Sequence, residues 1–360
     1  MTRLTVLDEI TGIAGGSEAL QDVAVVKILI IGGYRFLGRA LIETAVTAGH
    51  RVTVFGRGSH NPQNLVGVNW IVGDRHKDLS KLQGHEWDVV IDTCGFTPAA
   101  VGASALLLHD AVERYIFIST LSVYPWPVPR NAAESTPVAE ILAGTDPSEE
   151  TPETYGIRKA LCEHAAETVM PGRVLNARLG MLVGPHDYLD RLTYWIERAA
   201  RGGEILAPGS SDRPVQLLDV ADLADWLLRN AESGVTGAVN VTGPTYGATM
   251  GGFLQACLNA TESQGKLTWV EDDFLLNESV EMDADLPYWI PENENGLFEI
   301  NIDRAIATGL RTRPLFDTAL QAYQWIKDRS DATRNRGWDA AREAAVLARY
   351  HQRNDTTAIR

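Results

Sequence analysis

A tyrosine and a lysine four positions apart, Tyr155 and Lys159, are the side chains of this sequence best suited to moving a proton. On a helix this spacing places both side chains on one face, and a nearby ammonium favours the ionised phenol. A tyrosine phenol has a pKa near 10, so proton transfer by it near neutral pH needs a pKa about 3 units lower. Such a shift corresponds to roughly 4 kcal/mol of stabilisation of the phenolate. Such a pair also arises by chance on helix surfaces. Its position after a strand and a proline-rich loop favours a catalytic role.

Three hydroxyl side chains, Ser119, Thr120 and Ser122, follow an apolar segment at residues 115–118 that reads as a strand. Active groups of open α/β sheets gather at the carboxyl ends of strands. We therefore predict that Thr120 hydrogen-bonds a substrate oxygen beside Tyr155. The alternative is that these hydroxyls only satisfy the backbone at the strand end.

A glycine-rich turn near the N-terminus has the context of a dinucleotide site. It lies between an apolar run at 25–31 and a helical stripe at 36–48. The N–H groups and the dipole of such a helix start bind a pyrophosphate; a turn without a ligand is the alternative. Arg35 fills the position of the middle glycine and adds a permanent cation. The residues predicted to contact the cofactor here are Gly32, Tyr34, Arg35, Phe36, Leu37 and Gly38.

The end of the second expected strand, at residues 51–55, favours NADP(H) over NAD(H). Folds that prefer NAD place an acid there to bind the ribose 2′-OH, but here Gly56 occupies that place and Arg57 follows. The alternative is a solvated arginine on a surface loop, and NAD(H) stays possible. Asp74 either accepts from the adenine amino group or caps the next turn. Further contacts are expected from Thr93, Cys94, Gly95 and Ser119, and from Tyr155 and Lys159.

The elements that position these residues alternate between strand and helix patterns. Strands are expected at 25–31, 51–55, 68–72, 88–91, 115–118, 174–183, 215–218 and 237–241, and helices at 36–48, 155–169, 191–201, 220–231 and 338–351. The alternation predicts an α/β fold: a Rossmann-type, doubly wound parallel sheet. A smaller C-terminal mixed α/β substrate domain is expected beside it.

The expected domain boundaries follow from the same pattern. Residues 1–24 are expected to be a leader, 25–185 and about 215–245 the dinucleotide-binding domain, and about 186–214 and 246–330 the substrate domain. Residues 331–360 form a polar tail with an exposed helix. The proline-rich segment at 125–150 is a loop of a length usually kept for function.

Composition narrows the class of protein. Lys and Arg number 32 and Asp and Glu 47, so the net charge is −15, and such a surface disfavours nucleic acid and anionic lipid. No apolar run reaches the roughly 18 residues of a membrane span, and no secretion signal opens the chain. The three cysteines, Cys94, Cys162 and Cys257, show no metal spacing and suit a reducing cytoplasm. No metal site is expected.

Taken together, these motifs resemble the short-chain dehydrogenase/reductase superfamily, in its extended or atypical branch of NAD-dependent epimerase/dehydratase-like proteins. The resemblance covers about residues 27–330 and implies that Thr120, Tyr155 and Lys159 form the catalytic set. It also implies a homodimer through helices at 102–110 and 155–169. The glycine-rich turn is similar to a subgroup that includes chloroplast stem-loop-binding proteins, many of which lack a complete catalytic set.

The predicted activity is an NADP-dependent oxidoreductase or epimerase that transfers hydride at a secondary alcohol or ketone of a small polar molecule. The alternative is a non-catalytic, NAD(P)-binding regulatory or RNA-associated protein of the same fold. The resemblance implies that members acting on sugar nucleotides carry an arginine near Val215 and Gln216, which binds the diphosphate. This sequence instead has its arginine earlier, at Arg213, which places recognition of a nucleotide diphosphate in doubt. The candidate pocket walls are Ser122, Tyr124, Trp126, His186, Tyr188, Gln216, Tyr288 and Trp289.

Overall fold

Seven parallel strands form the central sheet of the computed structural model, which describes residues 25–59, 66–141, 146, 149–327 and 336–358. The expected leader at 1–24 lies outside the described residues. The strand order is β10-β6-β5-β4-β1-β2-β3, and every pairing is parallel. This confirms the Rossmann-type sheet. The strands are β1 (Lys27–Ile31), β2 (Arg51–Gly56), β3 (Val68–Val72), β4 (Val89–Asp92), β5 (Arg114–Thr120), β6 (Val174–Leu179) and β10 (Gly237–Val241).

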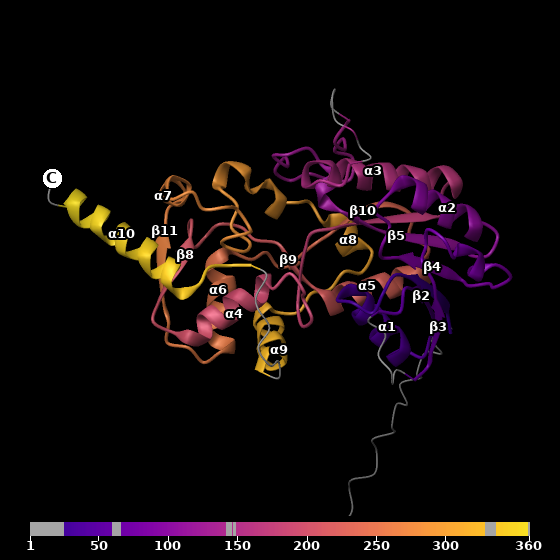
Figure 1. Cartoon of the computed structure of the whole chain (residues 1–360), viewed down its shortest axis with the longest axis horizontal. Coiled ribbons are helices and arrows are strands. Elements are labelled where there is room, and N and C mark those ends of the chain that lie inside the picture. The colour runs from indigo at the N-terminus through magenta and orange to yellow at the C-terminus, as the bar shows by residue number, and fades with distance from the viewer. Residues whose placement is uncertain (1–24, 60–65, 142–145, 147–148, 328–335, 359–360) are drawn as a thin grey trace, which may run out of the picture.

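Helices cover both faces of this sheet (Figure 1). On one face α1 (Leu37–Thr47) packs against α5 (Val220–Ser233), and on the other α2 (Pro98–Leu108) packs against α3 (Pro152–Val169). Successive β1 side chains alternate between the two layers, because neighbouring residues of a strand point to opposite faces. Ile28 joins the core under α1 and α5, and Leu29 joins the core under α2 and α3.

The strand expected at 174–183 is two strands, which is the main departure from the predicted elements. β6 ends at Leu179, and β7 (Met181–Val183) pairs instead with β9 (Leu217–Asp219). Gly180 lies at the break, where an added Cβ would come within 2.3 Å of the Thr242 hydroxyl oxygen. The chain therefore leaves the central sheet at Gly180 and enters the second half of the molecule.

The second half has its own core and a small parallel sheet. β8 (Glu204–Pro208) pairs with β11 (Lys266–Val270), and Trp195, Phe253 and Trp289 are among its fully buried side chains. Its helices are α4 (Arg191–Arg201), α6 (Met250–Ala260), α7 (Asp272–Asn277) and α9 (Leu315–Lys327). The short α8 (Asp303–Ala307) packs instead against β10 of the central sheet. Three short 3-10 helices are also present: η1 (Leu79–Leu82), η2 (Leu121–Val123) and η3 (Glu292–Phe298).

The expected tail helix is present as α10 (Ala340–Ala358), which projects from the second half in Figure 1 and is mostly exposed, but it is anchored along one face. Val346, Leu347 and Tyr350 are buried in the second core. Glu343, which is 4% exposed, forms an ion pair with the buried Arg198 of α4. Periodic polar residues on the outer face hid this buried stripe. No helix in the described ranges is long and apolar enough to cross a lipid bilayer.

Candidate functional site

A cavity of about 570 Å³ runs along the carboxyl ends of β1, β2, β4 and β5. Ligands of open α/β sheets bind at this edge. The cavity brings together most of the residues predicted to bind cofactor or to catalyse. Those that line it are Gly32, Arg35, Phe36, Leu37, Gly38, Arg57, Asp74, Thr93, Cys94, Ser119, Thr120, Tyr155 and Lys159.

The glycine-rich turn presents the open N-terminus of α1 to this cavity. Phe36, the residue before α1, has φ 39° and ψ −103°; no side chain caps the helix, and its first turn holds no acid. An added Cβ at Gly38 would lie 2.1 Å from the Gly33 carbonyl oxygen, so only glycine allows this turn. An uncapped helix start without acids fits a pyrophosphate.

Tyr34 is not among the residues that line the cavity. Its hydroxyl donates a hydrogen bond to Glu43 at 2.6 Å, and its ring packs edge-on against Trp70. Burial and the neighbouring Glu43 carboxylate raise the pKa of Tyr34 to about 12. The side chain therefore braces α1 rather than facing the cavity.

At the end of β2, Gly56 lies so close to Gly32 that no side chain fits. An added Cβ would lie 2.3 Å from the Gly32 carbonyl oxygen, so a carboxylate at this position is sterically excluded. Arg57 follows as an exposed side chain on the cavity wall. Asp74 also lines the cavity, and its carboxylate accepts from the His76 amide at 2.8 Å, which is the turn-capping role.

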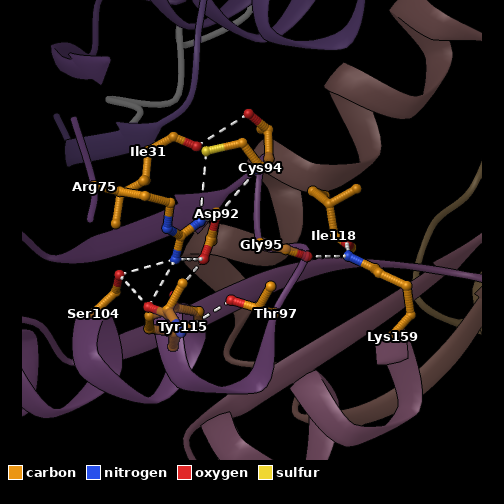
Figure 2. Close-up of polar contacts among 12 residues, drawn as sticks. Ile31, Arg75, Asp92, Cys94, Gly95, Thr97, Ser104, Tyr115, Ile118 and Lys159 are labelled. Atoms are coloured by element: carbon orange, nitrogen blue, oxygen red, sulfur yellow. Dashed lines mark hydrogen bonds and ion pairs between the residues drawn. The ribbon is translucent and has the colours of Figure 1, made fainter. Parts of the chain in front are cut away.

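The ammonium of Lys159 is fixed by two backbone carbonyls. It donates to the oxygens of Gly95 at 2.8 Å and of Ile118 at 2.6 Å, and it lies 3.9 Å from the centre of the Phe117 ring. The residue is 3% exposed. Burial lowers the pKa of Lys159 to about 8, against nearby negative groups that act in the opposite direction. Figure 2 shows this ammonium reaching across to Gly95 and Ile118.

Tyr155 lies beside Thr120 at the end of β5. Burial raises the pKa of Tyr155 above its usual 10.0, and the hydrogen bond with Thr120 partly opposes this. The expected lowering of the tyrosine pKa by Lys159 is therefore not seen, because the ammonium is turned to the two carbonyls. Arg158, on the next turn of α3, is a cation that favours the phenolate.

The start of α3 holds Tyr155 at a fixed depth. Thr151 and Thr154 form a reciprocal capping box, and Pro152 begins the helix, a position where proline costs nothing. Gly156 then meets the backbone of η2: an added Cβ would lie 1.9 Å from the Ser122 carbonyl oxygen. This contact sets the separation between the tyrosine and the hydroxyl run.

Comparisons with known proteins decide the family. The profile of the NAD dependent epimerase/dehydratase family matches residues 28–242. The chain belongs to this family. The resemblance inferred from the glycine turn and the Tyr–Lys pair is thereby confirmed.

Individual relatives of the family are more distant. The chain is 28% identical over 256 residues to the chloroplast stem-loop binding protein of 41 kDa b of Arabidopsis thaliana, a match that spans 65% of this chain and 63% of that protein. WbmH of Bordetella bronchiseptica, solved with NAD⁺, has a TM-score of 0.62 at 16% identity and covers 84% of this chain and 99% of its own. UDP-glucuronic acid 4-epimerase of Bacillus cereus, solved with NAD, has a TM-score of 0.60 at 17% identity and covers 84% and 98%.

Of the pocket walls expected in this family member, only Tyr188 lines the cavity. It lies in the loop between β7 and α4, with the Arg35 guanidinium carbon 4.0 Å from its ring centre and the Phe36 ring edge-on to it. Ser122 is not among the lining residues, although its hydroxyl accepts from that of Thr120 at 3.2 Å.

The remaining expected walls are corrected. Tyr288 and Trp289 are fully buried in the second core, since both are large rings at the centre of that half. Tyr124 is buried, and its hydroxyl is engaged by Asn240 and Arg178. The other three also have structural partners instead of a cavity: Trp126 donates to Glu294, Gln216 bonds the Ile300 backbone, and His186 packs on Trp325.

Two buried ion pairs beside the site were not predicted from the sequence. On α3 and β6, Glu163 pairs with Arg178 at 2.8 Å and accepts from the Ser119 hydroxyl at 2.5 Å. At the end of β4, Asp92 pairs with Arg75 through two bonds, at 2.8 and 2.9 Å. The one signal in the sequence was a charged residue inside or at the end of a buried strand, which needs a partner.

Proposed function

We propose that this protein is an NAD(P)-dependent oxidoreductase or epimerase that acts on a secondary alcohol or ketone of a small molecule. The observation that carries the proposal is that Thr120, Tyr155 and Lys159 line the same cavity as the uncapped start of α1. A bound nicotinamide dinucleotide would supply or accept hydride there. Residues of the glycine-rich turn, α1 and the ends of β2, β4 and β5 would hold it.

Each polar side chain then has one task. The Tyr155 phenol moves the proton of the substrate hydroxyl, and Thr120 orients the same oxygen through its own hydroxyl. Lys159 holds a positive charge on the cavity wall at the carboxyl end of β5, where its hydrogen bonds go to the Gly95 and Ile118 carbonyls rather than to the phenol. Burial of the phenol limits exchange with water, so proton transfer is directed to the bound substrate.

The cofactor is proposed to be NADP(H), with NAD(H) as the coarser alternative that the family name supports. An acid at residue 56 is excluded by the Gly32 carbonyl, and the exposed Arg57 lies on the cavity wall. A 2′-phosphate needs such a cation, because burying it unpaired is costly. Two solved relatives carry NAD, so the ratio of NADPH to NADH affinity is the test that separates the two.

For the substrate we propose an uncharged alcohol or ketone rather than a nucleotide diphosphate. The cavity wall near Tyr155 carries Phe96, Leu179, Leu182 and Tyr188. Three arginines of the second half and the proline-rich segment are paired with carboxylates, and none of the three lines the cavity, so they do not offer a diphosphate site there. The pairs are Arg191–Asp283 and Arg213–Asp272, bonded at 2.8 and 2.7 Å, and Arg130–Glu292 at 2.6 Å.

A non-catalytic, RNA-associated role is the second candidate, because one relative is named a stem-loop binding protein. The net charge of −15 weighs against RNA. We also propose a homodimer through α2 and α3, whose half-buried apolar residues Ala160, Leu161, Ala165 and Val169 suit a helix-to-helix contact. A cytoplasmic location is proposed from the free thiols of Cys94, Cys162 and Cys257.

Mass spectrometry of the cofactor that co-purifies with the protein tests the proposal. A screen of uncharged alcohols and ketones would follow, with nicotinamide absorbance or product isomers as the readout. We expect bound NADP(H) and turnover of an uncharged substrate. Binding of a defined RNA stem-loop with no cofactor and no turnover would favour the second candidate instead.

A further inference from the structure

The loop after β4 carries the carbonyl that holds the lysine, and a buried ion pair holds that loop. Gly95 accepts one of the two hydrogen bonds of the Lys159 ammonium. One residue earlier, the Cys94 amide donates to an Asp92 carboxylate oxygen at 3.1 Å. Asp92 is fully buried, and both oxygens of its carboxylate also accept hydrogen bonds from the Arg75 guanidinium (Figure 2).

Arg75 is tied down by more than its counter-charge. Its guanidinium also donates to the Ala100 carbonyl at 3.1 Å and to the Ser104 hydroxyl at 2.9 Å, both on α2. Tyr115 of β5 donates to Asp92 at 2.6 Å. The ion pair thus joins the loop after β3, the end of β4, α2 and β5 at one point.

Gly95 is closely packed at this point. An added Cβ would lie 2.6 Å from both Phe117 and Val101, and 3.1 Å from an Asp92 carboxylate oxygen. The direction of the Gly95 carbonyl is therefore set by the packing around it and by the bond between Asp92 and the turn. A rigid turn of this kind preorganises the group that it holds.

We propose that the Arg75–Asp92 ion pair is a positioning unit for Lys159, which it serves by fixing the turn at Cys94 and Gly95. The inference rests on the proposed function, in which Lys159 lies in the catalytic set. Arg75 and Asp92 act through the backbone and do not themselves carry out chemistry. Arg75 also lines the cavity, so the unit connects the cofactor wall with the lysine.

The charges of this unit affect the pKa of Lys159, which packing alone would not do. The Asp92 carboxylate raises the pKa of Lys159, whereas the Arg75 guanidinium lowers it, and burial is the larger influence. Removing the carboxylate therefore lowers the lysine pKa, because an ammonium loses its nearby opposite charge. The charged or titratable groups that face Lys159 are Asp92, Arg75, Cys94, Cys162 and Glu163.

The test is a pH titration of Lys159 by ¹³C-detected NMR, on protein carrying ¹³Cε-labelled lysine. The chain has 6 lysines, and Lys159→Met assigns the signal. We expect a wild-type midpoint of about 8 and a midpoint about one pH unit lower in Asp92→Asn. Ser104→Ala removes a partner of Arg75 but no charge, so its midpoint should match the wild type. An Asp92→Asn midpoint equal to the wild type would overturn the proposal.

Asp92→Asn leaves a buried cation without its counter-charge, so a second variant guards against misfolding. Arg75→Met with Asp92→Leu removes both charges, a replacement that buried ion pairs often tolerate. It should fold and shift the Lys159 signal, because the turn loses its carboxylate anchor, while its midpoint should move less than in Asp92→Asn, because the two removed charges act on the lysine in opposite directions. An unchanged signal and midpoint in this folded variant would also overturn the proposal. The titration needs neither cofactor nor substrate, so its result is separate from the fate of the proposed function.

Discussion

Substitution of Tyr155 is the most direct test of the proposed chemistry. Tyr155→Phe keeps the ring and removes the proton, so turnover should fall by about 10²–10⁴, the usual range for a positioned acid or base. The cofactor should still bind, because the phenol is one of many residues on the cavity wall. Steady-state kinetics and nicotinamide fluorescence measure the two effects. Tyr34→Phe is the matched control, since Tyr34 lies outside the cavity wall; near-normal turnover in Tyr155→Phe would remove the tyrosine from the catalytic set.

We expect the single side chain of Arg57 to set the preference for NADPH over NADH. Arg57→Ala should weaken NADPH binding about tenfold, which is the loss of one charge-assisted hydrogen bond on an open surface. NADH binding should stay unchanged, because NADH has no 2′-phosphate. Arg51, exposed at the opposite end of β2, supplies the control variant Arg51→Ala. Fluorescence titrations with both cofactors give the ratio, and a wild type that binds NADH as tightly as NADPH would assign the protein to the NAD users.

At the scale of elements, the position of α3 depends on the close contact between Gly156 and the backbone of η2. Gly156→Ala puts a methyl group 1.9 Å from the Ser122 carbonyl oxygen, so α3 must shift away from η2. We expect a loss of about 1–3 kcal/mol in the free energy of unfolding, as for other overpacked sites, together with lost turnover. Gly102→Ala on α2 is the matched control, because its new methyl group would lie 3.9 Å from Ala165. That change should stabilise by up to about 1 kcal/mol, and denaturant titration separates the two outcomes.

Most elements could be predicted because buried strands and helices leave their period in the sequence. The apolar run at the first strand and the stripe on the first helix both coincide with β1 and α1 to within a few residues. The break at Gly180 could not be predicted, since it depends on Thr242, far along the chain. The partners of Lys159 are carbonyls, and the partner of Arg75 is 17 residues away, so no spacing rule marks them. Helices and strands can be predicted from local periodicity, whereas buried polar contacts join residues that come together only in the folded chain.

At the scale of the whole molecule, Glu343 ties the C-terminal helix to the second half. Glu343→Gln leaves the buried Arg198 without its counter-charge, so the free energy of unfolding should fall by about 3 kcal/mol. The comparison is Glu278→Gln, which breaks the more exposed pair between Glu278 and Arg349 and should change stability little. Thermal and chemical unfolding measure both. Equal effects in the two variants would mean that α10 is held by its apolar face alone.

The path of the chain between the two cores has a mechanical consequence. After β6 the chain crosses into the second core at Val183, returns at Leu218, crosses again by Met250 and returns at Ile300 before α9 enters the second core once more. Neither half is a continuous stretch that protease could release intact. The crossing strands β7 and β9 are hydrogen-bonded to each other, so unfolding of one half disrupts the other. Heating should therefore unfold both halves in a single calorimetric transition.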